Sequence, residues 1–264
     1  MKLLRLYCAK LLSNQPMPHF LKDAKSVTIE NAAVYFGKDL EAMSFALNYH
    51  QWIADEFSPY IGRCVAEVGA GTGNFSEFVL QRGAKKLFAF EPSSNMYPLL
   101  RERFISDNRV EVRNSLFVDS NNEFVESFDS VLYVNVLEHI ELDGEELRVA
   151  YRTIKAGGYL LIFVPALKCL YSELDNKLGH FRRYHKRDLC DVVTGAGFDI
   201  TCVKYFDIAG IIPWYLAFVL LKKTMTGGNV SAYDRFVVPP MRFIEGLLAP
   251  PIGKNILLVA SKRK

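Results

Sequence analysis

The residues best suited to chemistry in this sequence lie in the stretch VAEVGAGTGNF. Glycine costs conformational entropy unless the backbone needs a positive φ or must approach something closely. Gly69, Gly71 and Gly73 stand at alternate positions, so they predict a turn whose backbone wraps a ligand. A dinucleotide-binding turn, G-x-G-x-x-G, would place its third glycine where this sequence has Asn74. Glu67, just ahead of the turn, would repel a pyrophosphate and suits a cationic ligand.

A second acid supports a ligand that contains a nucleoside. Glu91 ends the apolar run LFAFE about twenty residues after the turn, where a carboxylate can accept hydrogen bonds from both ribose hydroxyls. S-adenosylmethionine carries a nucleoside, a sulfonium and an ammonium but no phosphate, so it also suits Glu67. The E-x-G-x-G-x-G turn resembles motif I of the class I S-adenosylmethionine-dependent methyltransferases. An NAD(P)-dependent oxidoreductase, which would use Glu91 in the same way, and a tight turn without a ligand are the alternatives.

The resemblance covers residues 45–205 and the last predicted strand, and it implies an S-adenosyl-L-methionine site. In that family the glycine turn and the ends of the second, third and fourth strands border the cofactor. LNYHQWI resembles the helix that lies over the cofactor in many members. Many members also have an acid at position 114, where an amide can still hydrogen-bond the adenine amine. The implied cofactor-binding residues are Glu67, Gly69, Ala70, Gly71, Gly73, Glu91, Pro92, Asn114, Ser115, Asn135, Val136 and Tyr49.

A histidine follows the fourth predicted strand, in YVNVLEHI, at the edge where cofactor and acceptor would meet. Methyl transfer to a hydroxyl or an ammonium requires the removal of a proton. We expect His139 to act as the general base, with Glu138 beside it as the second catalytic candidate; a histidine that only pins the loop is the alternative. Some ubiquinone-pathway and small-RNA methyltransferases carry E-x-x-E-H here and bind a divalent ion. Asn135 replaces the first acid of that pattern, so the sequence predicts no metal site.

A second informative stretch, LDNKLGHFRRYHKRDL, follows the fifth predicted strand. Class I methyltransferases often build the wall of the acceptor pocket there. The stretch resembles a subgroup of bacterial class I methyltransferases that share a GH(F/Y)RRY signature. We expect one arginine to face the pocket and the other to be structural, paired with Asp175 or a helix carboxylate. The substrate-binding candidates are His180, Arg182, Arg183 and Tyr184.

These side chains need a framework that brings the ends of several strands to one edge. From Arg63 onward, short apolar runs alternate with amphipathic segments, which is typical of βα units in a parallel sheet. We expect an α/β protein with a Rossmann-like class I methyltransferase fold: a seven-stranded, mostly parallel sheet with helices on both faces. The predicted strands are 64–68, 87–90, 110–112, 130–134, 159–164, 200–205 and 255–260. The predicted helices are 73–82, 95–104, 144–155 and 186–194, with Gly157-Gly158 ending the third.

Two regions fall outside this alternation. Residues 1–60 are predicted to form a helical N-terminal extension, ahead of an S-adenosylmethionine-binding domain made of 61–205 and 255–264. Residues 206–254 are too long for an ordinary connection, so we expect an apolar helical insertion that caps the acceptor; packing on the domain, dimerisation and membrane contact are the alternatives. Its stretch IAGIIPWYLAFVLL, residues 208–221, is interrupted by a proline and is too short to span a bilayer. A buried or interfacial helix is therefore expected.

Composition narrows the class of partner and the compartment. The 264 residues carry a formal net charge of +3, which argues against nucleic acid as the main partner. Five cysteines without a C-x-x-C pair form neither a disulfide framework nor a zinc site by spacing, so a cytoplasmic protein is expected. The expected partner is a small-molecule acceptor, which could be linked to a sugar or a lipid. The sequence leaves open whether the protein contacts a membrane peripherally and whether it is a monomer or a homodimer. A scaffold that binds the cofactor without turnover is a further alternative.

Overall fold

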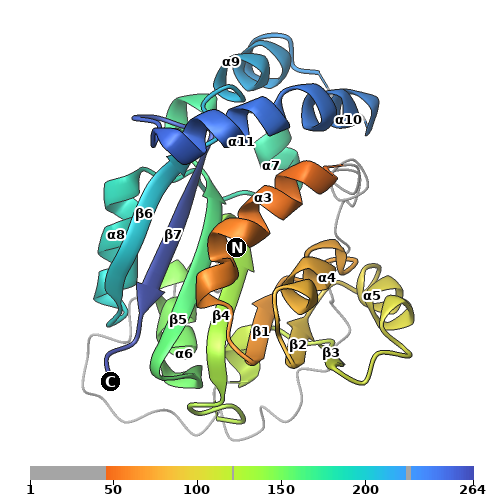
Figure 1. Ribbon diagram of the computed structural model, residues 1–264, viewed down its shortest axis with the longest axis vertical. Helices are drawn as coiled ribbons and strands as arrows, with labels where there is room; N and C mark the ends of the chain where they lie inside the picture. The colour runs from red at the N-terminus through yellow and green to blue at the C-terminus, as the bar shows by residue number, and fades with distance from the viewer. Residues whose placement is uncertain (1–45, 121, 224–226) are drawn as a thin grey trace, which may run out of the picture. The chain divides into compact units, whose positions relative to one another are not determined.

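The computed structural model describes residues 46–120, 122–223 and 227–264, and these are organised around a seven-stranded sheet (Figure 1). The strand order is β3-β2-β1-β4-β5-β7-β6. The first five strands pair in parallel, and β7 runs antiparallel to both β5 and β6. The expected α/β fold with a mostly parallel sheet is confirmed. The strands are β1 (Cys64–Val68), β2 (Lys86–Phe90), β3 (Val110–Arg113), β4 (Phe128–Val134), β5 (Ile154–Pro165), β6 (Asp199–Phe206) and β7 (Asn255–Ser261).

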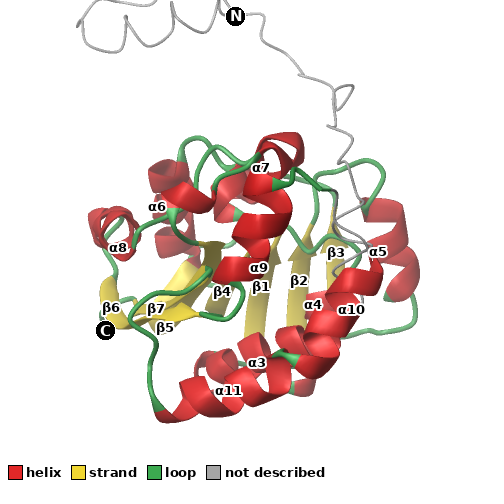
Figure 2. Cartoon of the chain, turned by 90° about the horizontal axis from the view of Figure 1, so that it is seen from above, coloured by secondary structure: helices red, strands yellow, loops and turns green. Residues whose placement is uncertain are grey.

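Helices cover both faces of this sheet (Figure 2). The α-helices are α3 (Leu47–Phe57), α4 (Asn74–Gln81), α5 (Tyr97–Arg103), α6 (Asp143–Thr153), α7 (Glu173–Leu178), α8 (Lys186–Gly195), α9 (Ile211–Trp214), α10 (Gly227–Phe236) and α11 (Val238–Leu247). Shorter turns of helix are η2 (Ser58–Tyr60), η3 (Phe117–Ser120), η4 (Leu137–His139), η5 (Lys168–Leu170) and the π-helical η6 (Tyr215–Leu220).

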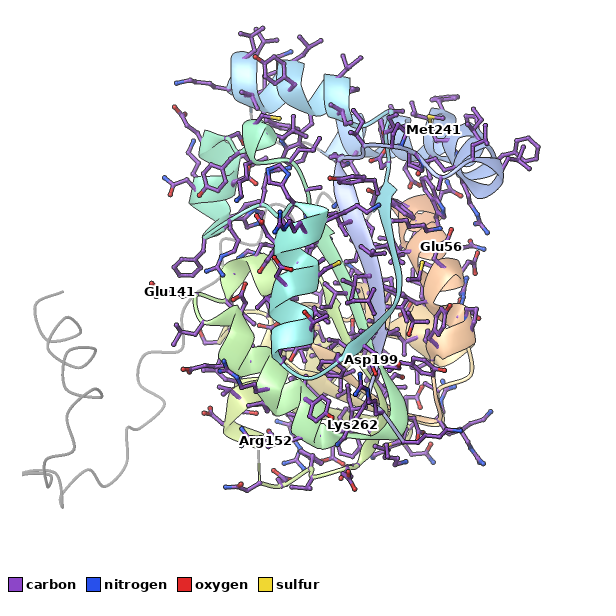
Figure 3. All side chains as sticks on the ribbon, turned by 90° about the vertical axis from the view of Figure 1, so that its left-hand side faces the viewer. Glu56, Glu141, Arg152, Asp199, Met241 and Lys262 are labelled. Carbon is purple, nitrogen blue, oxygen red and sulfur yellow. The ribbon has the colours of Figure 1, made fainter. Side chains whose placement is uncertain are left out.

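Two apolar layers result, one on each face of the sheet. One layer contains α3, α4 and α5, with Val79 fully buried in it. The other contains α6 and α8, with Leu147 fully buried. Figure 3 views the sheet from its side, with Glu56 of α3 and Glu141, which precedes α6, on opposite sides of it. Because both faces are covered, the central strands are apolar on both sides, as their sequences predict.

The strand order determines where a ligand can bind. β1 lies between β2 and β4, so the direction in which the chain adds strands reverses at β1. In open parallel sheets, ligands bind outside the carboxyl ends of the strands at this point of reversal. The glycine turn follows the carboxyl end of β1, and the segment that contains His139 follows the carboxyl end of β4. The fold therefore brings both predicted motifs to one edge.

The glycine pair Gly157-Gly158 lies inside β5 and not at the end of a helix, so this predicted boundary is wrong. Helix α6 ends at Thr153, and β5 begins at the next residue. The pairing of β5 with β4 shifts register in this region. A Cβ on Gly158 would lie 2.7 Å from the backbone oxygen of Asp129. The close approach of two strands, and not a helix cap, requires glycine here.

A buried charge cluster joins the helical segment between β6 and β7 to the sheet. Asp207, directly after β6, forms an ion pair with Lys254 Nζ at 2.8 Å and accepts a hydrogen bond from the Tyr233 hydroxyl on α10. Glu245 on α11 accepts a hydrogen bond from the Asp207 amide at 3.0 Å. Buried charges are tolerated when they are paired in this way. The cluster holds α10 and α11 at the edge of the sheet where the motifs meet.

The same segment also holds the start of α3. The carboxylate of Asp234, on α10, accepts hydrogen bonds from the backbone amides of Asn48 at 3.0 Å and Tyr49 at 2.8 Å. Amides in the first turn of a helix have no partner within the helix, and a negative charge there is favourable. Helix α3 and η2 occupy the end of the predicted 1–60 extension. Residues 1–45 of that extension lie outside the described residues.

The apolar stretch 208–221 does not form a buried helix, which corrects one of the two expected forms. Residues 211–221 are all at least partly exposed. The large exposed side chains of α9, η6 and the residue after them, which we call the α9–η6 apolar surface, are Ile212, Tyr215, Leu216, Leu220 and Leu221. Because this stretch is apolar on every side of its helices, its sequence does not indicate which side chains will pack against the rest of the protein. In the described part of the chain, no helix is long and apolar enough to cross a membrane.

Candidate functional site

A cavity of about 310 Å³ opens at the carboxyl edge of the sheet. This volume is in the range of small-molecule sites, roughly 300–1,000 Å³. The predicted site residues that line it are Tyr49, Glu67, Gly69, Ala70, Gly71, Glu91, Pro92, Asn135, Val136, Glu138, His139, His180 and Arg183. Predicted site residues that do not line it are Gly73, Asn114, Ser115, Arg182 and Tyr184.

The glycine turn takes a backbone path that favours glycine at each of its three positions. The φ angle is +67° at Gly69, +58° at Gly71 and +84° at Gly73, values that residues with a Cβ rarely adopt. Gly69 and Gly71 line the cavity. Gly73 instead faces α5, because a Cβ there would lie 2.5 Å from the Phe104 ring. Gly69 and Gly71 therefore leave this part of the cavity wall without side chains, although Gly69 also packs against Val136, and Gly73 allows α4 and α5 to pack closely.

Glu67, at the end of β1, is a buried acid that faces the cavity. The Ser76 hydroxyl donates a hydrogen bond of 2.6 Å to its Oε2. Burial raises the pKa of Glu67 to about 7; the hydrogen bond from Ser76 opposes this change, and the nearby charge of Glu91 adds to it. A carboxylate in this position is stabilised when a positive charge binds next to it. The position fits the cationic ligand that the sequence predicts.

Glu91, directly after β2, is held by backbone amides. Its Oε2 accepts a hydrogen bond from Gly71 N–H at 2.7 Å, and its Oε1 accepts one from Ser93 N–H at 2.8 Å. The side chain is therefore fixed beside the turn, and the other lone pairs of both oxygens are available to a ligand. Asn114 does not reach the cavity, since its Nδ2 donates to the backbone oxygen of Glu91 at 2.9 Å. Asn114 therefore fixes the backbone of Glu91 and does not face the ligand site.

The segment after β4 packs against the glycine turn through Val136. Asn135 has a positive φ of +54°, and its amide donates to the Phe163 backbone oxygen at 2.8 Å. This conformation places Val136 against the glycine turn: a Cβ on Gly69 would lie 2.6 Å from a Val136 methyl carbon. Asn135 and Val136, predicted from the sequence to bind the cofactor, both line the cavity; their contact with a cofactor stays a prediction.

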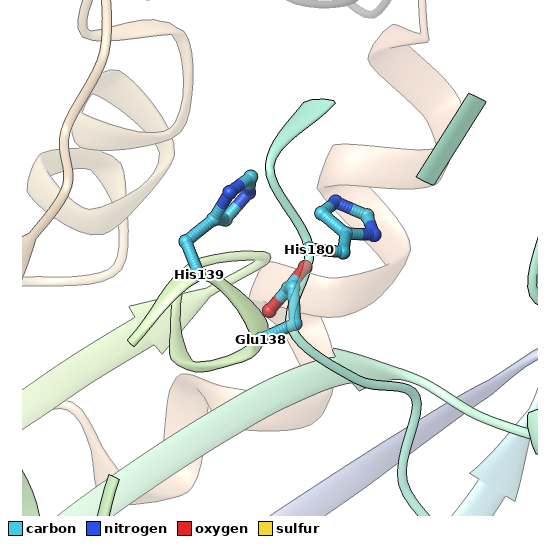
Figure 4. Close-up of side chains that lie close together, drawn as sticks. All are labelled: Glu138, His139 and His180. Atoms are coloured by element: carbon cyan, nitrogen blue, oxygen red, sulfur yellow. The ribbon is translucent and has the colours of Figure 1, made fainter. Parts of the chain in front are cut away.

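Glu138, His139 and His180 form a side-chain cluster next to this segment (Figure 4). The two imidazole rings are perpendicular, with centroids 4.6 Å apart. Burial, together with the neighbouring His180, lowers the pKa of His139 to about 4. Burial raises the pKa of Glu138 to about 7. Among the described residues, no hydrogen-bond donor meets either carboxylate oxygen of Glu138.

Asp175, on α7, organises the GHFRRY stretch. Its carboxylate pairs with Arg183 Nε at 2.7 Å and with His180 Nδ1 at 2.9 Å, and it accepts a hydrogen bond from the Ser172 hydroxyl at 2.8 Å. Burial opposes the ionisation of Asp175, but the hydrogen bonds and the Arg183 charge together lower its pKa to about 2. The Arg183 guanidinium also stacks over Trp214, 4.6 Å from the ring centroid. Arg183 therefore combines the structural role and the cavity-facing role that were expected of separate arginines.

The other two substrate-binding candidates, Arg182 and Tyr184, do not line the cavity. Arg182 donates to Asp143 Oδ2 at 2.6 Å and to the Glu141 backbone oxygen at 2.7 Å. The Tyr184 hydroxyl donates to the same Asp143 oxygen at 2.7 Å. These contacts attach the stretch to the start of α6. We therefore assign Arg182 and Tyr184 to the support of the cavity wall and not to contact with a substrate.

A comparison with models of protein families identifies the family to which the chain belongs. A family model described as a methyltransferase domain matches residues 33–203, which is more than half of the chain. The chain belongs to this family of S-adenosylmethionine-dependent methyltransferases. The family is the one that the E-x-G-x-G-x-G turn resembles, so the NAD(P)-dependent alternative is set aside. The cofactor of the family is S-adenosylmethionine.

Two curated relatives resemble parts of this methyltransferase domain. A ubiquinone biosynthesis O-methyltransferase of Pseudomonas entomophila is 32% identical over 107 residues, which are 40% of this chain and 46% of the relative. A tRNA U34 carboxymethyltransferase of Helicobacter acinonychis is 26% identical over 103 residues, which are 38% of this chain and 39% of the relative. The matches span less than half of each relative.

A solved structure supports the fold of the methyltransferase domain. Phosphoethanolamine N-methyltransferase 2 of Haemonchus contortus, in complex with S-adenosyl-L-methionine, superposes with a TM-score of 0.59 and 17% sequence identity. The match covers 82% of this chain and 53% of that chain. At this identity the similarity concerns the arrangement of the sheet and helices.

The residues present fit S-adenosylmethionine. Glu67 presents a buried carboxyl group whose ionised form suits a cationic ligand, Gly69 and Gly71 leave the turn without side chains, and Glu91 presents a fixed carboxylate beside them. We call the part of the cavity lined by Glu67, Gly69, Gly71, Glu91 and Asn135 the cofactor half. The acceptor half is lined by Glu138, His139, His180, Arg183, Trp214 and Lys254.

Sequence reasoning did not nominate Trp214, Lys254 and Asn255 individually in the wall of the methyltransferase cavity. Trp214 Nε1 donates to the Leu170 backbone oxygen at 3.1 Å, which turns the ring inward from α9. Lys254 lies over the Tyr49 ring, 5.1 Å from its centroid, and the Tyr49 hydroxyl donates to Asn255 Oδ1 at 3.2 Å. The only available sequence signal was the length of the insertion that carries Trp214 and ends at Lys254.

Proposed function

We propose that this protein transfers the methyl group of S-adenosylmethionine to an oxygen or nitrogen atom of a small-molecule acceptor. The observation that carries the proposal is the continuity of one cavity from the cofactor half to the acceptor half. The names of the relatives are consistent with either acceptor atom, since they include an O-methyltransferase and an N-methyltransferase. The acceptor would enter beside Glu138, His139 and His180.

The chain's own residues have two tasks in such a reaction. S-adenosylmethionine supplies an activated methyl group, so alignment and the exclusion of water are the main contributions of the protein. An acceptor hydroxyl or ammonium must also lose its proton, and a positioned side chain typically accelerates that step by about 10²–10⁴-fold. His139 lines the acceptor half, and it is our candidate for the residue that promotes proton loss. Glu138 lies beside it.

Two measurements test this proposal. Calorimetric titration of S-adenosylmethionine and NAD in parallel should give binding of the first compound only. A panel of hydroxyl- and amine-bearing acceptors should then give turnover, and His139→Ala should lower turnover far more than it weakens the binding of S-adenosylhomocysteine. The matched control is His185→Ala, because His185 does not line the cavity. Cofactor binding without turnover on any acceptor would favour the scaffold alternative.

We further propose that the insertion caps the acceptor half and brings it to a lipid surface. Trp214 faces the cavity while its neighbours form the α9–η6 apolar surface. The exposed residues Lys222, which pairs with Glu173 at 2.6 Å, and Lys223 follow that surface directly. An apolar surface beside cations is suited to the interface of an anionic membrane. An acceptor with an apolar, lipid-like part would then reach the cavity from the membrane.

Two variants separate the cap from the lipid contact. Replacement of residues 208–221 by a Gly/Ser linker should preserve S-adenosylhomocysteine affinity and abolish acceptor turnover, because it removes Trp214. The double variant Leu220→Ser and Leu221→Ser keeps Trp214 and should reduce co-sedimentation with anionic liposomes while leaving cofactor affinity unchanged. Full turnover in the linker variant would refute the cap, and unchanged co-sedimentation of the double variant would refute the lipid contact.

A further inference from the structure

The Glu138–His139–His180 cluster has the composition and spacing of a metal site. One potential ligand atom of each residue lies within 4.8 Å of those of the other two. Glu138 and His139 come from η4, and His180 comes from the loop after α7, so the fold unites two segments that are distant in the sequence (Figure 4). This set differs from E-x-x-E-H, because Asn135 occupies the position of the first acid and His180 supplies a third ligand.

The state of the Glu138 carboxylate is an independent indication of a missing partner. The residue is 0% exposed, and no donor in the described part of the chain forms a hydrogen bond with either oxygen. Buried polar groups are nearly always partnered, and an unpartnered buried carboxylate is costly. Glu138 also lines the cavity, as do both histidines, and its carboxylate lies within 4.8 Å of a ring nitrogen of each. A cation bound at the cluster would satisfy both oxygens.

The two histidines are oriented by neighbours in the manner of metal ligands. The Asp175 carboxylate contacts His180 Nδ1 at 2.9 Å and is itself held by Arg183 and Ser172. Hydrogen bonds to the backbone of Leu178 and Gly179 orient the His139 ring. In metal sites, a carboxylate or backbone carbonyl commonly binds one ring nitrogen and fixes the orientation of the other. The cluster therefore has a supporting shell as well as ligands.

We propose that Glu138, His139 and His180 bind a divalent transition-metal ion, and that this ion holds the hydroxyl oxygen of the acceptor. Two imidazoles and one carboxylate favour zinc, iron(II) or manganese over magnesium and calcium, which prefer oxygen ligands alone. Three protein ligands leave coordination positions open, and all three residues line the cavity.

The metal site deepens the proposed function, on which its catalytic role rests, by naming the acceptor class. A hydroxyl bound to a divalent cation has a lowered pKa, so its proton passes to water more readily. The acceptor would then be an alcohol, phenol or enol, and the reacting atom an oxygen. His139 would act as a ligand that positions the acceptor and not as the base that receives the proton.

Metal binding to the full-length protein tests the site without any turnover. After chelation and dialysis, titration with zinc, manganese and iron(II) should give one bound ion per chain, and cobalt(II) should give the visible spectrum of a low-coordination site. Loss of an outer-shell partner alone typically costs 10–100-fold in metal affinity, so Glu138→Gln and His180→Ala should each lose at least that much. His185→Ala should bind metal as the wild type does.

Several outcomes would overturn the inference. One is the absence of stoichiometric binding of all these ions; another is wild-type affinity in both ligand variants. Unchanged binding of S-adenosylhomocysteine verifies that each variant is folded, and His180→Asn replaces any variant that is not. Turnover that persists in the metal-free enzyme would refute the role of the ion in holding the acceptor while the proposed methyl transfer stands. Stoichiometric metal binding without turnover on any acceptor would instead refute the proposed function and leave the site intact.

Discussion

The cofactor half of the cavity is built from short stretches at the ends of neighbouring strands, whereas the acceptor half is assembled from segments spread over more than a hundred residues. In the cofactor half, backbone geometry matters as much as side chains: Gly71 donates its amide to Glu91 and leaves room for a ligand. In the acceptor half, side chains such as Arg183 and Trp214 contact one another directly.

This difference separates a half whose determinants are local in the sequence from a half that depends on contacts between distant segments. The cofactor half needs a strand, a glycine turn and an acid after the next strand, and all of these lie within about seventy residues. The acceptor half depends on the pairing of α7, the GHFRRY stretch and the insertion. A substitution in one half should therefore leave the other half largely intact, and the following predictions test that independence.

The largest expected effect is the loss of stability in Asp175→Ala. The Asp175 and Arg183 side chains are 0% and 1% exposed, and removal of one partner of a buried ion pair typically costs about 3–5 kcal/mol. Denaturant unfolding should show a loss of this size. The affinity for S-adenosylhomocysteine in the folded protein should stay close to that of the wild type, because the hydrogen bonds and ion pairs of this pair in the described part of the chain involve no residue of the cofactor half.

The control for Asp175→Ala is Asp188→Ala. Asp188 pairs with Lys168 at 2.7 Å, but both side chains are exposed, so the expected loss is about 1 kcal/mol or less. Equal losses in the two variants would contradict the assignment of Asp175 as the centre of the acceptor wall.

Glu91→Ala should produce the largest change in cofactor affinity. If the carboxylate accepts hydrogen bonds from the ribose hydroxyls, its removal should cost about 1.5–3 kcal/mol, or roughly 10- to 150-fold in dissociation constant. Calorimetry with S-adenosylhomocysteine measures this change, and thermal unfolding serves as the control for folding. An unchanged dissociation constant would remove Glu91 from the cofactor half.

The affinity for S-adenosylmethionine should rise with pH through the ionisation of Glu67. Its pKa of about 7 implies an ionised fraction of about one tenth at pH 6 and about nine tenths at pH 8, so the affinity for the cation should increase by up to about tenfold. Below this pKa the neutral Glu67 carboxyl dominates, and above it the ionised carboxylate, which attracts the cationic ligand, dominates. Glu67→Gln should bind more weakly at pH 8 and lose this dependence; a profile equal to that of the wild type would assign the pH dependence to another group.

The smallest expected effect is that of Asn114→Ala on cofactor affinity. The Asn114 amide contacts the Glu91 backbone and not the cavity, so S-adenosylhomocysteine affinity should change by about twofold, the size typical of substitutions away from a site. Competition binding against the wild type resolves such a change. A loss as large as that of Glu91→Ala would restore the sequence prediction that Asn114 binds the adenine.

Much of the cofactor half could be predicted from sequence because its determinants are local. The alternate glycines require left-handed backbone, and the positions of Glu67 and Glu91 follow from the ends of two strands. The errors are also physical in origin. Gly73 has the same conformational signal as Gly69 and Gly71, but packing against Phe104 and not a ligand explains it. The pair Gly157-Gly158 was predicted to end a helix, because the sequence alone does not show that a neighbouring strand passes close to these residues.

The sequence by itself determined the class of fold, the glycine turn and the two acids that flank it, since each depends on contacts between near neighbours or on backbone conformation. Only the tertiary structure decided that His180 joins Glu138 and His139, that Arg183 faces inward while Arg182 faces Asp143, and that Trp214 reaches the cavity. These outcomes depend on how separate segments pack, and the directions of side chains across such contacts have no periodic signal in the sequence. The side-chain arrangement of the acceptor half therefore depends on tertiary packing, whereas that of the cofactor half follows from a strand, a glycine turn and an acid that are close in the sequence.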